Sequence, residues 1–480
     1  MTSEVQFWDG QIWELMIALG FLFAAMLLGN VLRRKISLIN RSLIPSAVIG
    51  GFLMLLVVGL YSGITGKALF KTATLEAITY HGLGLGLVAL SFRTGKKESG
   101  KERNRDIFNS GVTTVATYLL QAVMGLGITL CLHYVLGNWA AAGILLPMGF
   151  GQGPGQAFNW GVIYQTATDY PAFQNGASFG LSVAALGFVA SSIGGVIYLQ
   201  SMRKKGLIKV QGVNLDEAED ISVDMVSQKG EIPIAESLDK LTVQFGLVFT
   251  AYMLGYGLMW LISLGLDSLG GFFEGTVKPL IWGFNFLFGM LFAAVIKAMM
   301  RGLKKAGYMN REYTNNFMLN RISGLTFDLM VVTSIAAINL SAFLHKEFII
   351  PLLLICIAGT AGTYWFVRWI CRQLFSKYEG EQFLAMYGML TGTASTGLIL
   401  LRQADPQYKT PASGNLVYQN LWAIVFGFPM LLLMGVVAQS LTMSWITLGL
   451  VTLLLAVMLV ILFRSKLFKK KHKETGGYAR

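Results

Sequence analysis

The sequence contains few charged residues. Asp, Glu, Lys and Arg make up only 13% of its 480 residues, whereas an average soluble domain has roughly 25%. So small a share can cover only part of a water-exposed surface, and apolar stretches of about 20 residues, long enough to span a bilayer, recur along the chain. The composition excludes a disordered chain, a fibre and an ordinary soluble enzyme. We expect a polytopic membrane protein.

Cysteines and catalytic motifs are also scarce. The three cysteines, Cys131, Cys356 and Cys371, lie in apolar stretches without a CxxC or Cys/His spacing, so no disulfide framework or metal site is predicted. The sequence has no HExxH, no GxSxG with a triad partner and no Walker A motif, and its four histidines are far apart. We therefore expect neither an enzyme nor an ATP-driven pump, and any transport would use an ion gradient.

Long apolar stretches divide the chain into membrane spans. The predicted spans are 11–32, 44–61, 75–92, 107–136, 176–200, 241–265, 279–300, 322–343, 348–370, 415–440 and 445–463. Two further stretches, 139–166 and 382–403, are interrupted by Gly, Pro and small polar residues, which argues against a continuous helix through lipid. We interpret both as re-entrant hairpins. No basic residue precedes Arg33, so a cleaved signal peptide is not expected.

The basic residues predict the orientation in the membrane. With residue 1 outside, these spans place all but four of the 38 Lys and Arg residues in the cytoplasm, in keeping with the positive-inside rule. The N-terminus is therefore predicted outside and the C-terminus in the cytoplasm. We attribute the net charge of +13 to this topology and to contact with anionic lipid, and expect no nucleic-acid partner.

The pattern of spans occurs twice. Residues 1–200 contain five spans and one broken stretch, residues 201–240 form a hydrophilic cytoplasmic linker, and residues 241–440 repeat the pattern. Because five is odd, the second half enters from the opposite side, as in the inverted repeats of secondary transporters. Residues 441–480 add a span and a basic tail. The predicted fold is all-α, with two inverted-topology repeats of five transmembrane helices, a re-entrant broken hairpin in each, and one extra C-terminal transmembrane helix.

The first broken stretch reads Gly-Phe-Gly-Gln-Gly-Pro-Gly-Gln over residues 149–156. Non-helical backbone at membrane depth is tolerated only where protein or a water-filled cavity surrounds it. Glycines let backbone groups turn toward a ligand, and a helix beginning near Gln156 would direct its positive end at an anion. We predict that Gln152, Gln156 and Asn159 hydrogen-bond a substrate. The alternative is a glycine-rich packing seam.

The second broken stretch reads Thr-Gly-Thr-Ala-Ser-Thr-Gly over residues 391–397. The hydroxyls of Thr391, Thr393, Ser395 and Thr396 suit Na⁺, a hard cation that takes oxygen ligands. The alternative for each is a hydrogen bond to the carbonyl four residues earlier in its own helix.

Ionised groups within spans are costly and often functional. Asp328 is the one carboxylate clearly inside a predicted span, where it could bind Na⁺ or carry a coupled proton. A structural ion pair with Arg321, on the same helical face, is the alternative. Arg402 could bind a substrate carboxylate, or it could reach to the membrane surface as an orienting cation.

Three segments carry a resemblance to a known family. They are Leu-Gly-Asn at 28–30 with Ile-Pro-Ser-Ala-Val-Ile-Gly-Gly at 44–51, Gly-Gln-Gly-Pro-Gly-Gln-Ala-Phe at 151–158, and the break at 392–396. Over most of residues 20–440 the chain resembles the bacterial sodium/glutamate symporters. Gln152 and Pro154 stand where that family has histidine and threonine.

The resemblance implies a Na⁺-coupled amino-acid importer of the bacterial cytoplasmic membrane. It implies a homodimer in which a transport domain moves like an elevator against a scaffold. It further implies that substrate and Na⁺ binding involve Gly151, Gly153, Gly155, Gly392 and Thr396.

Together these features predict a Na⁺-driven symporter of a small carboxylate, glutamate being the first choice. The only ion expected is Na⁺, held by the second broken stretch with Asp328, and no other cofactor is expected. A proton-coupled exchanger or exporter of an organic anion that uses Asp328 is the first alternative. A channel or a non-transporting membrane sensor is the second.

Overall fold

The described part of the chain is entirely helical. The computed structural model describes residues 8–93, 100–166, 172–206, 239–271, 273–406 and 409–474, and within these ranges it contains helices and no β-strand. Nine of the helices there are long and apolar enough to cross a bilayer, or ten if one bent pair counts as a span. This agrees with the predicted all-α polytopic membrane protein.

The nine helices coincide with predicted apolar stretches. They are α1 (Gly10–Lys35), α3 (Ser46–Thr65), α4 (Thr72–Phe92), α5 (Lys101–Leu136), α8 (Gly176–Lys204), α10 (Lys240–Leu269), α12 (Asn285–Lys305), α14 (Lys346–Leu374) and α19 (Leu441–Glu474). Local signals set several of their ends. Asp239 caps α10 by accepting from the N–H groups of Leu241 and Thr242, and α3 and α5 each end at a glycine with positive φ, Gly66 and Gly137.

Two of the eleven predicted spans differ in the structure. Residues 322–343 were expected to form one span, but α13 (Asn316–Ala336) ends before a short 3-10 turn, η4 (Leu340–Leu344), which the Asn339 side chain caps. Because α13 contains Asn320, Arg321 and Asp328, it is not among the helices apolar enough to count as candidate spans. The stretch 415–440 forms α17 (Ala412–Tyr418) and α18 (Asn420–Val437), with a bend of 50° between them.

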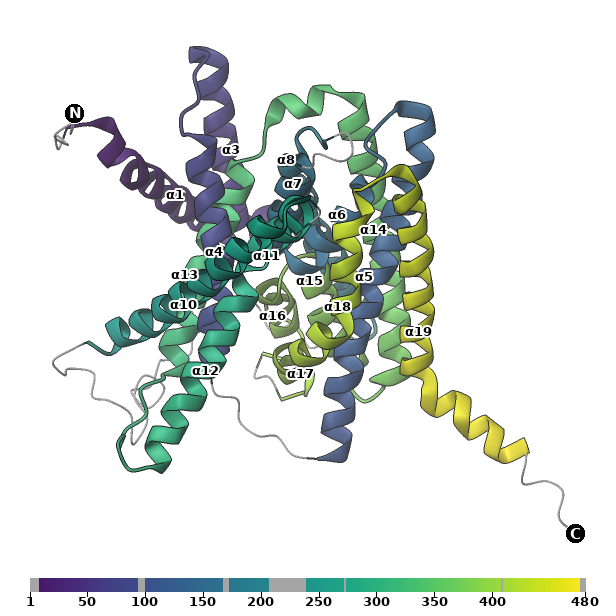
Figure 1. The fold of residues 1–480 in the computed structure, drawn as a ribbon. Helices are drawn as coiled ribbons and strands as arrows, with labels where there is room; N and C mark the ends of the chain where they lie inside the picture. The colour runs from purple at the N-terminus through teal and green to yellow at the C-terminus, as the bar shows by residue number, and fades with distance from the viewer. Residues whose placement is uncertain are drawn as a thin grey trace, which may run out of the picture.

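The helices form two groups that lie side by side (Figure 1). One group, on the left of the view, contains α1, α3, α4, α10, α12 and α13, and its apolar cores are centred on α4 and α13. The other, on the right, contains α5, α14, α18 and α19 around a larger core. Between them lie α7 (Pro154–Gln165) and α8, which contribute buried side chains such as Trp160 and Leu181 to the two groups. The two helices therefore join the groups.

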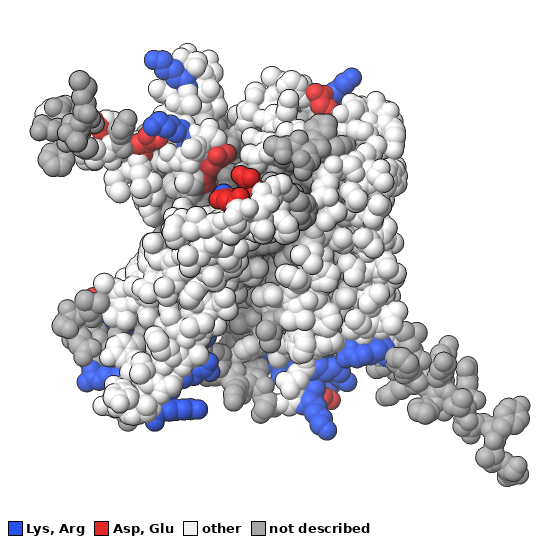
Figure 2. Space-filling view, viewed as in Figure 1, with Lys and Arg blue, Asp and Glu red and all other residues white. Residues whose placement is uncertain are grey.

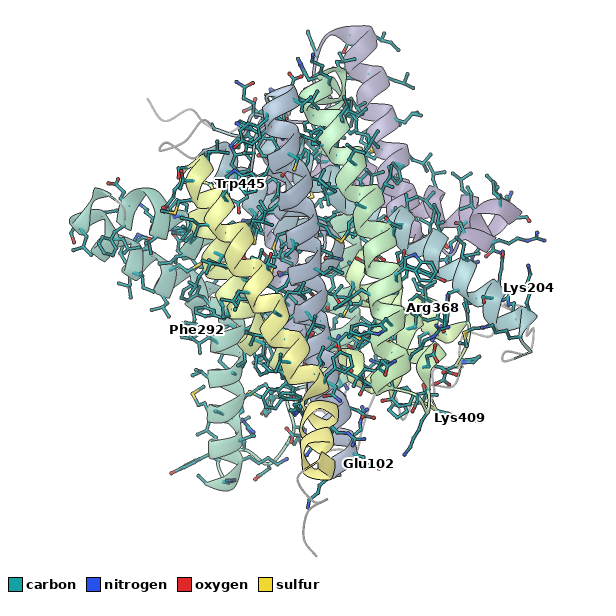
Figure 3. All side chains as sticks on the ribbon, turned by 90° about the vertical axis from the view of Figure 1, so that its right-hand side faces the viewer. Glu102, Lys204, Phe292, Arg368, Lys409 and Trp445 are labelled. Carbon is teal, nitrogen blue, oxygen red and sulfur yellow. The ribbon has the colours of Figure 1, made fainter. Side chains whose placement is uncertain are left out.

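Basic side chains gather at one edge of the helix array. Figure 2 shows Lys and Arg along the lower edge of the molecule, below α12 and α5, whereas most visible carboxylates lie in the upper half. In Figure 3, Glu102 at the start of α5 and Trp445 near the start of α19 lie toward opposite ends, so these two packed helices run antiparallel. Residues 207–238 of the predicted linker, and the side chains of the basic tail, lie outside the described residues.

Candidate functional site

The first broken stretch is a series of short helical turns. Leu145–Pro147 (α6) continues into a π-helical turn, η2 (Met148–Gln152), and α7 begins at Pro154. Between them Gly153 has φ 86° and ψ −178°, a conformation essentially restricted to glycine. Proline suits the first position of α7 because that position needs no N–H donor. The break falls within the predicted segment 149–156.

The second broken stretch interrupts two helices at a similar point. Helix α15 (Glu379–Thr391) ends at Gly392, and α16 (Ala394–Arg402) begins after Thr393. The Thr393 hydroxyl caps α16, lying 3.5 Å from the Thr396 nitrogen and 3.2 Å from the Thr396 hydroxyl. This break, too, falls within the predicted segment, 391–397.

The two breaks face each other in the fold. A Cβ atom placed on Gly153 would lie 3.3 Å from Cγ2 of Thr393 and 3.8 Å from the carbonyl oxygen of Gly392. Helices α7 and α16 therefore both begin where the breaks meet. The first N–H groups of a helix lack partners within the helix and carry partial positive charge. Two such helix ends make the junction suited to an anion.

Helix α5 holds both breaks in place. Its Tyr118 hydroxyl donates to the Gly151 carbonyl at 3.0 Å, and its Gln121 amide donates to the Leu390 carbonyl at 2.9 Å and to Thr363 on α14 at 2.9 Å. Neither Tyr118 nor Gln121 was identified from the sequence. The available signal was a polar series, Thr113, Thr114, Thr117 and Gln121, inside an otherwise apolar span, and all four are buried.

The predicted substrate residues of the first break have different surroundings. Gln156 is only 2% exposed, and neither its amide oxygen nor its amide nitrogen has a hydrogen-bond partner among the described residues. The Asn159 amide nitrogen donates to the Gly283 carbonyl at 3.0 Å, while its oxygen lacks a partner there. Gln152 is half-buried. Buried polar atoms are nearly always paired, so Gln156 marks a place for a polar ligand.

Two of the glycines also serve close packing. A Cβ atom on Gly151 would overlap the Tyr118 ring, and one on Gly155 would lie 2.8 Å from Cβ of Leu83 on α4 and 2.9 Å from Sδ of Met330 on α13. The packing alternative therefore applies to these glycines. It does not account for Gln156, whose amide has no partner in the part of the chain that the structure describes.

Some hydroxyls of the second break already form hydrogen bonds with the backbone. Thr391 is buried and donates to the Tyr387 carbonyl at 2.7 Å, so the alternative of a bond within its own helix holds for this residue. Thr396 is buried beside Thr393, and Ser395 is exposed. Carbonyl oxygens at the end of α15 and these hydroxyls are the oxygen atoms available to a cation at the junction.

The two predicted ionised residues lie away from helix-helix cores. Asp328 is exposed on α13, and among the described residues it forms no ion pair or hydrogen bond. The alternative ion pair with Arg321 is not found, and the Arg321 guanidinium instead lies 5.0 Å from the centre of the Phe317 ring. Arg402 is exposed in the last turn of α16.

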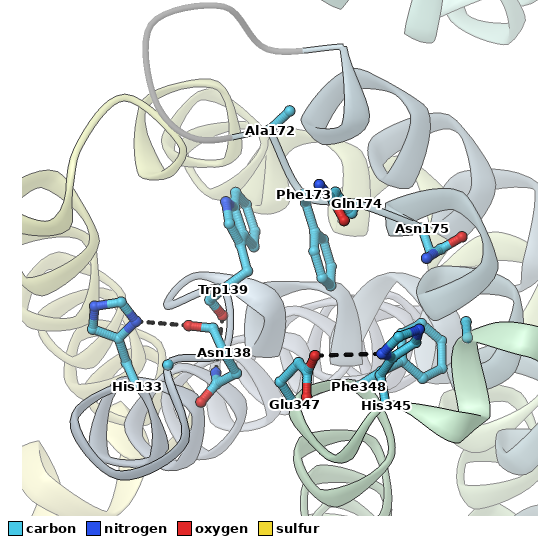
Figure 4. A pocket seen from close by; sticks show the side chains of 12 residues that line it. His133, Asn138, Trp139, Ala172, Phe173, Gln174, Asn175, His345, Glu347 and Phe348 are labelled. Carbon is cyan, nitrogen blue, oxygen red and sulfur yellow. Dashed lines mark hydrogen bonds and ion pairs between the residues drawn. The ribbon is translucent and has the colours of Figure 1, made fainter.

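A cavity of about 380 Å³ lies at the base of the first broken stretch (Figure 4). Trp139 and Phe173 stack at 4.7 Å on one side of it. On another side, His345 lies 3.6 Å from the Glu347 carboxylate. His133, near Trp139, contacts the Asn138 carbonyl at 2.6 Å. No prediction from the sequence placed a site here.

The turn that follows α16 is built around Asp405. Its carboxylate accepts from the N–H groups of Lys409 and Thr410, at 2.9 and 2.8 Å, and from the Thr410 hydroxyl at 2.7 Å. Burial raises the pKa of Asp405, but these hydrogen bonds and the Lys409 charge outweigh it and hold the pKa below its usual value.

The pKa of Asp405 is lower in the folded protein than in the unfolded chain, so its ionised form stabilises the fold at pH values above the unfolded pKa. This stabilisation is lost as the pH falls through the folded pKa. We expect Asp405→Asn to lower the melting temperature at neutral pH, with the difference from wild type shrinking between about pH 5 and pH 3. Thermal unfolding of both proteins across this range measures it. A difference that stays constant with pH would contradict the assigned hydrogen bonds.

Comparison with known proteins adds no relative. No protein-family model matches the sequence, and no curated protein has significant similarity to it.

Proposed function

We propose that this protein is a Na⁺-coupled symporter of a small carboxylate, with glutamate as the first candidate because of the resemblance to the sodium/glutamate symporters. One observation carries the proposal. Two broken segments from opposite halves of the sequence meet where α7 and α16 begin, and the first turn of α7 contains Gln156, which is buried and has no hydrogen-bond partner among the described residues. Broken helices that meet in this way are typical of substrate and ion sites in secondary transporters.

The junction offers different partners to an anion and to a cation. A substrate carboxylate would accept hydrogen bonds from the first N–H groups of α7, while Gln152, Gln156 and Asn159 would bind its other polar groups. Na⁺ would take oxygen atoms from the end of α15 and from Thr393, Ser395 and Thr396. Carboxylate and Na⁺ would then stabilise each other because their charges are opposite.

We also propose that the chain is an inverted repeat with two re-entrant hairpins. Helix pairing supports this: α1 packs on α3 as α10 packs on α12, and α3 packs on α13 as α12 packs on α4. Helices α4 and α13 pack on each other, and α5 packs on α14, as expected if corresponding helices face each other across a pseudo-two-fold axis. The basic edge would lie in the cytoplasm.

Alternating access would come from movement of one helix group against the other. Both breaks belong to the side of the molecule that contains α5, α8 and α14, which also supplies Tyr118 and Gln121 to hold them. Contact with the other group runs through α7, which packs on α4 and α13, and through α8, which contributes Leu181 to the core of that group. Gly155 permits this close contact. A rigid group that holds both breaks is what an elevator-like motion requires.

Ligand-dependent stability of the purified protein tests the proposal. We expect one small carboxylate, glutamate first, to raise the melting temperature in Na⁺ but not when choline replaces Na⁺, because a ligand that binds only the folded protein stabilises it by mass action. In uptake assays, Gln152→Ala and Thr396→Ala should lose transport at unchanged membrane abundance. Wild-type uptake in both variants would remove the site assignment. A shift that tracks pH without Na⁺ would favour a proton-coupled exchanger using Asp328.

A further inference from the structure

A second cavity lies at the ends of α4 and α12, remote in sequence from both breaks. Its volume is about 270 Å³. Its lining includes five cationic side chains and one carboxylate: Arg93, Lys297, Arg301, Lys304, Arg311 and Glu312. Five positive charges and one negative charge leave a net charge of +4 on the walls. A cavity with such an excess of one sign attracts an anion.

The walls of this cavity are fixed by hydrogen bonds. The Lys297 ammonium donates to the carbonyls of Ser91 and Arg93, at 2.9 and 2.7 Å, and so joins α12 to the end of α4. Buried Gln244 on α10 donates to the Tyr313 carbonyl at 2.7 Å and accepts from the Asn315 N–H at 3.0 Å. These bonds hold the segment before α13 against the other helices. The cations are therefore held together despite their mutual repulsion.

The guanidinium of Arg93 is incompletely matched among the described residues. Lys304 pairs with Glu312 at 3.0 Å, and Glu312 is the one carboxylate among the described residues that line the cavity. The Nε atom of Arg93 is buried and has no hydrogen-bond partner among those residues. Arginine N–H groups bind phosphate oxygens well because their planar geometry allows two parallel hydrogen bonds. An anion with several oxygens would satisfy this arrangement.

The position of the cavity in the last turns of α12 indicates where this anion comes from. Four residues at every fourth position of α12 are exposed and apolar: Leu291, Val295, Met299 and Leu303. Residues at this spacing form one stripe along a helix, and this stripe marks the side of α12 that faces lipid. Lys297, Arg301 and Lys304 lie on the other side of the last turns of the same helix. The cavity therefore lies near the point where a lipid-facing helix surface ends, and basic pockets between membrane helices suit phospholipid headgroups.

We propose that this cavity binds the phosphate group of an anionic phospholipid. The proposal is independent of the transported substrate. The test uses full-length protein in detergent, stripped of lipid, with phosphatidylglycerol, phosphatidylcholine or inorganic phosphate added. We expect phosphatidylglycerol to raise the melting temperature, whereas phosphatidylcholine and millimolar phosphate leave it nearly unchanged.

The double variant Arg93→Gln and Arg301→Gln should weaken phosphatidylglycerol binding by roughly tenfold or more, because two lining cations are lost. The matched control, Lys204→Gln with Lys305→Gln, removes the same charge from exposed residues outside the cavity and should bind as wild type does. Native mass spectrometry of retained lipid reports binding even if a variant is less stable. Equal retention by both double variants would overturn the proposal. If inorganic phosphate stabilised the protein as strongly as phosphatidylglycerol does, the lipid would be overturned as the source of the bound phosphate group.

Discussion

Gln156→Leu is expected to lower substrate uptake by about tenfold or more without lowering the thermal stability of the protein. The side chain is buried and both of its amide atoms lack partners among the described residues. An unsatisfied buried amide costs about 1 to 3 kcal/mol, so replacing it with an apolar group of similar size should leave the melting temperature unchanged or higher. A hydrogen bond to a charged substrate is worth about 1.5 to 3 kcal/mol, which corresponds to this loss of binding.

Gln121→Leu is the matched control for this experiment. The Gln121 amide donates to both Thr363 and the Leu390 carbonyl, so its removal leaves the buried carbonyl of Leu390 without this donor and should lower the melting temperature. Uptake in proteoliposomes and thermal unfolding of both variants give the comparison. If Gln156→Leu unfolds as easily as Gln121→Leu, Gln156 has a structural role. If it transports at the wild-type rate, the substrate does not bind there.

Gly143→Ala is expected to lower the free energy of unfolding by about 3 kcal/mol, the upper end of the usual cost of overpacking. Gly143 lies in the turn before the first break and crosses Gly125 of α5. A Cβ atom on Gly143 would overlap the carbonyl of Gly125, and one on Gly125 would overlap the carbonyl of Gly143. Because the obstacle is backbone rather than a flexible side chain, α5 and the broken stretch would have to separate.

Gly125→Ala should have a similar effect, and Gly127→Ala provides its control. Gly127 lies on the same helix with no atom within 4 Å of an added Cβ, so alanine there should stabilise α5 by up to about 1 kcal/mol through helix propensity. Thermal unfolding and the yield of folded protein in detergent measure the difference. Equal stability of Gly125→Ala and Gly127→Ala would mean that α5 and the broken stretch can separate at no cost.

Most helix boundaries followed from local signals in the sequence. Apolar stretches that are long enough to span a bilayer predicted nine of the helices. Gly153 and Gly392 lie where the helices were expected to break. The span expected at 322–343 ended early because the capped turn at Asn339 stops α13. Eleven spans were predicted, whereas nine helices of the described residues, or ten with the bent pair, qualify as candidate spans. Polar residues on α13 lower its hydropathy, and length alone does not decide whether a helix crosses lipid.

The candidate site was predictable only in part. Glycine, proline and amide side chains identified the first break, because their backbone effects are local. The partners of those side chains were not predictable. Thr391 donates a hydrogen bond within its own helix, and Tyr118 and Gln121 hold the breaks from α5. Arg321 lies over the Phe317 ring, and Asp328 has no ion pair with any other described residue.

The sequence by itself determined an all-helical membrane protein, the positions of its helices and the two points where helices are interrupted, because hydropathy, helix capping and glycine conformation act over one or two turns of chain. Only the tertiary structure decided that Gly153 meets Thr393, that Gln156 is buried with no hydrogen-bond partner among the described residues, and that five cations share one cavity. These depend on contacts between residues far apart in sequence. Such contacts are set by how helices pack against each other, and close packing at a few glycines determines that arrangement.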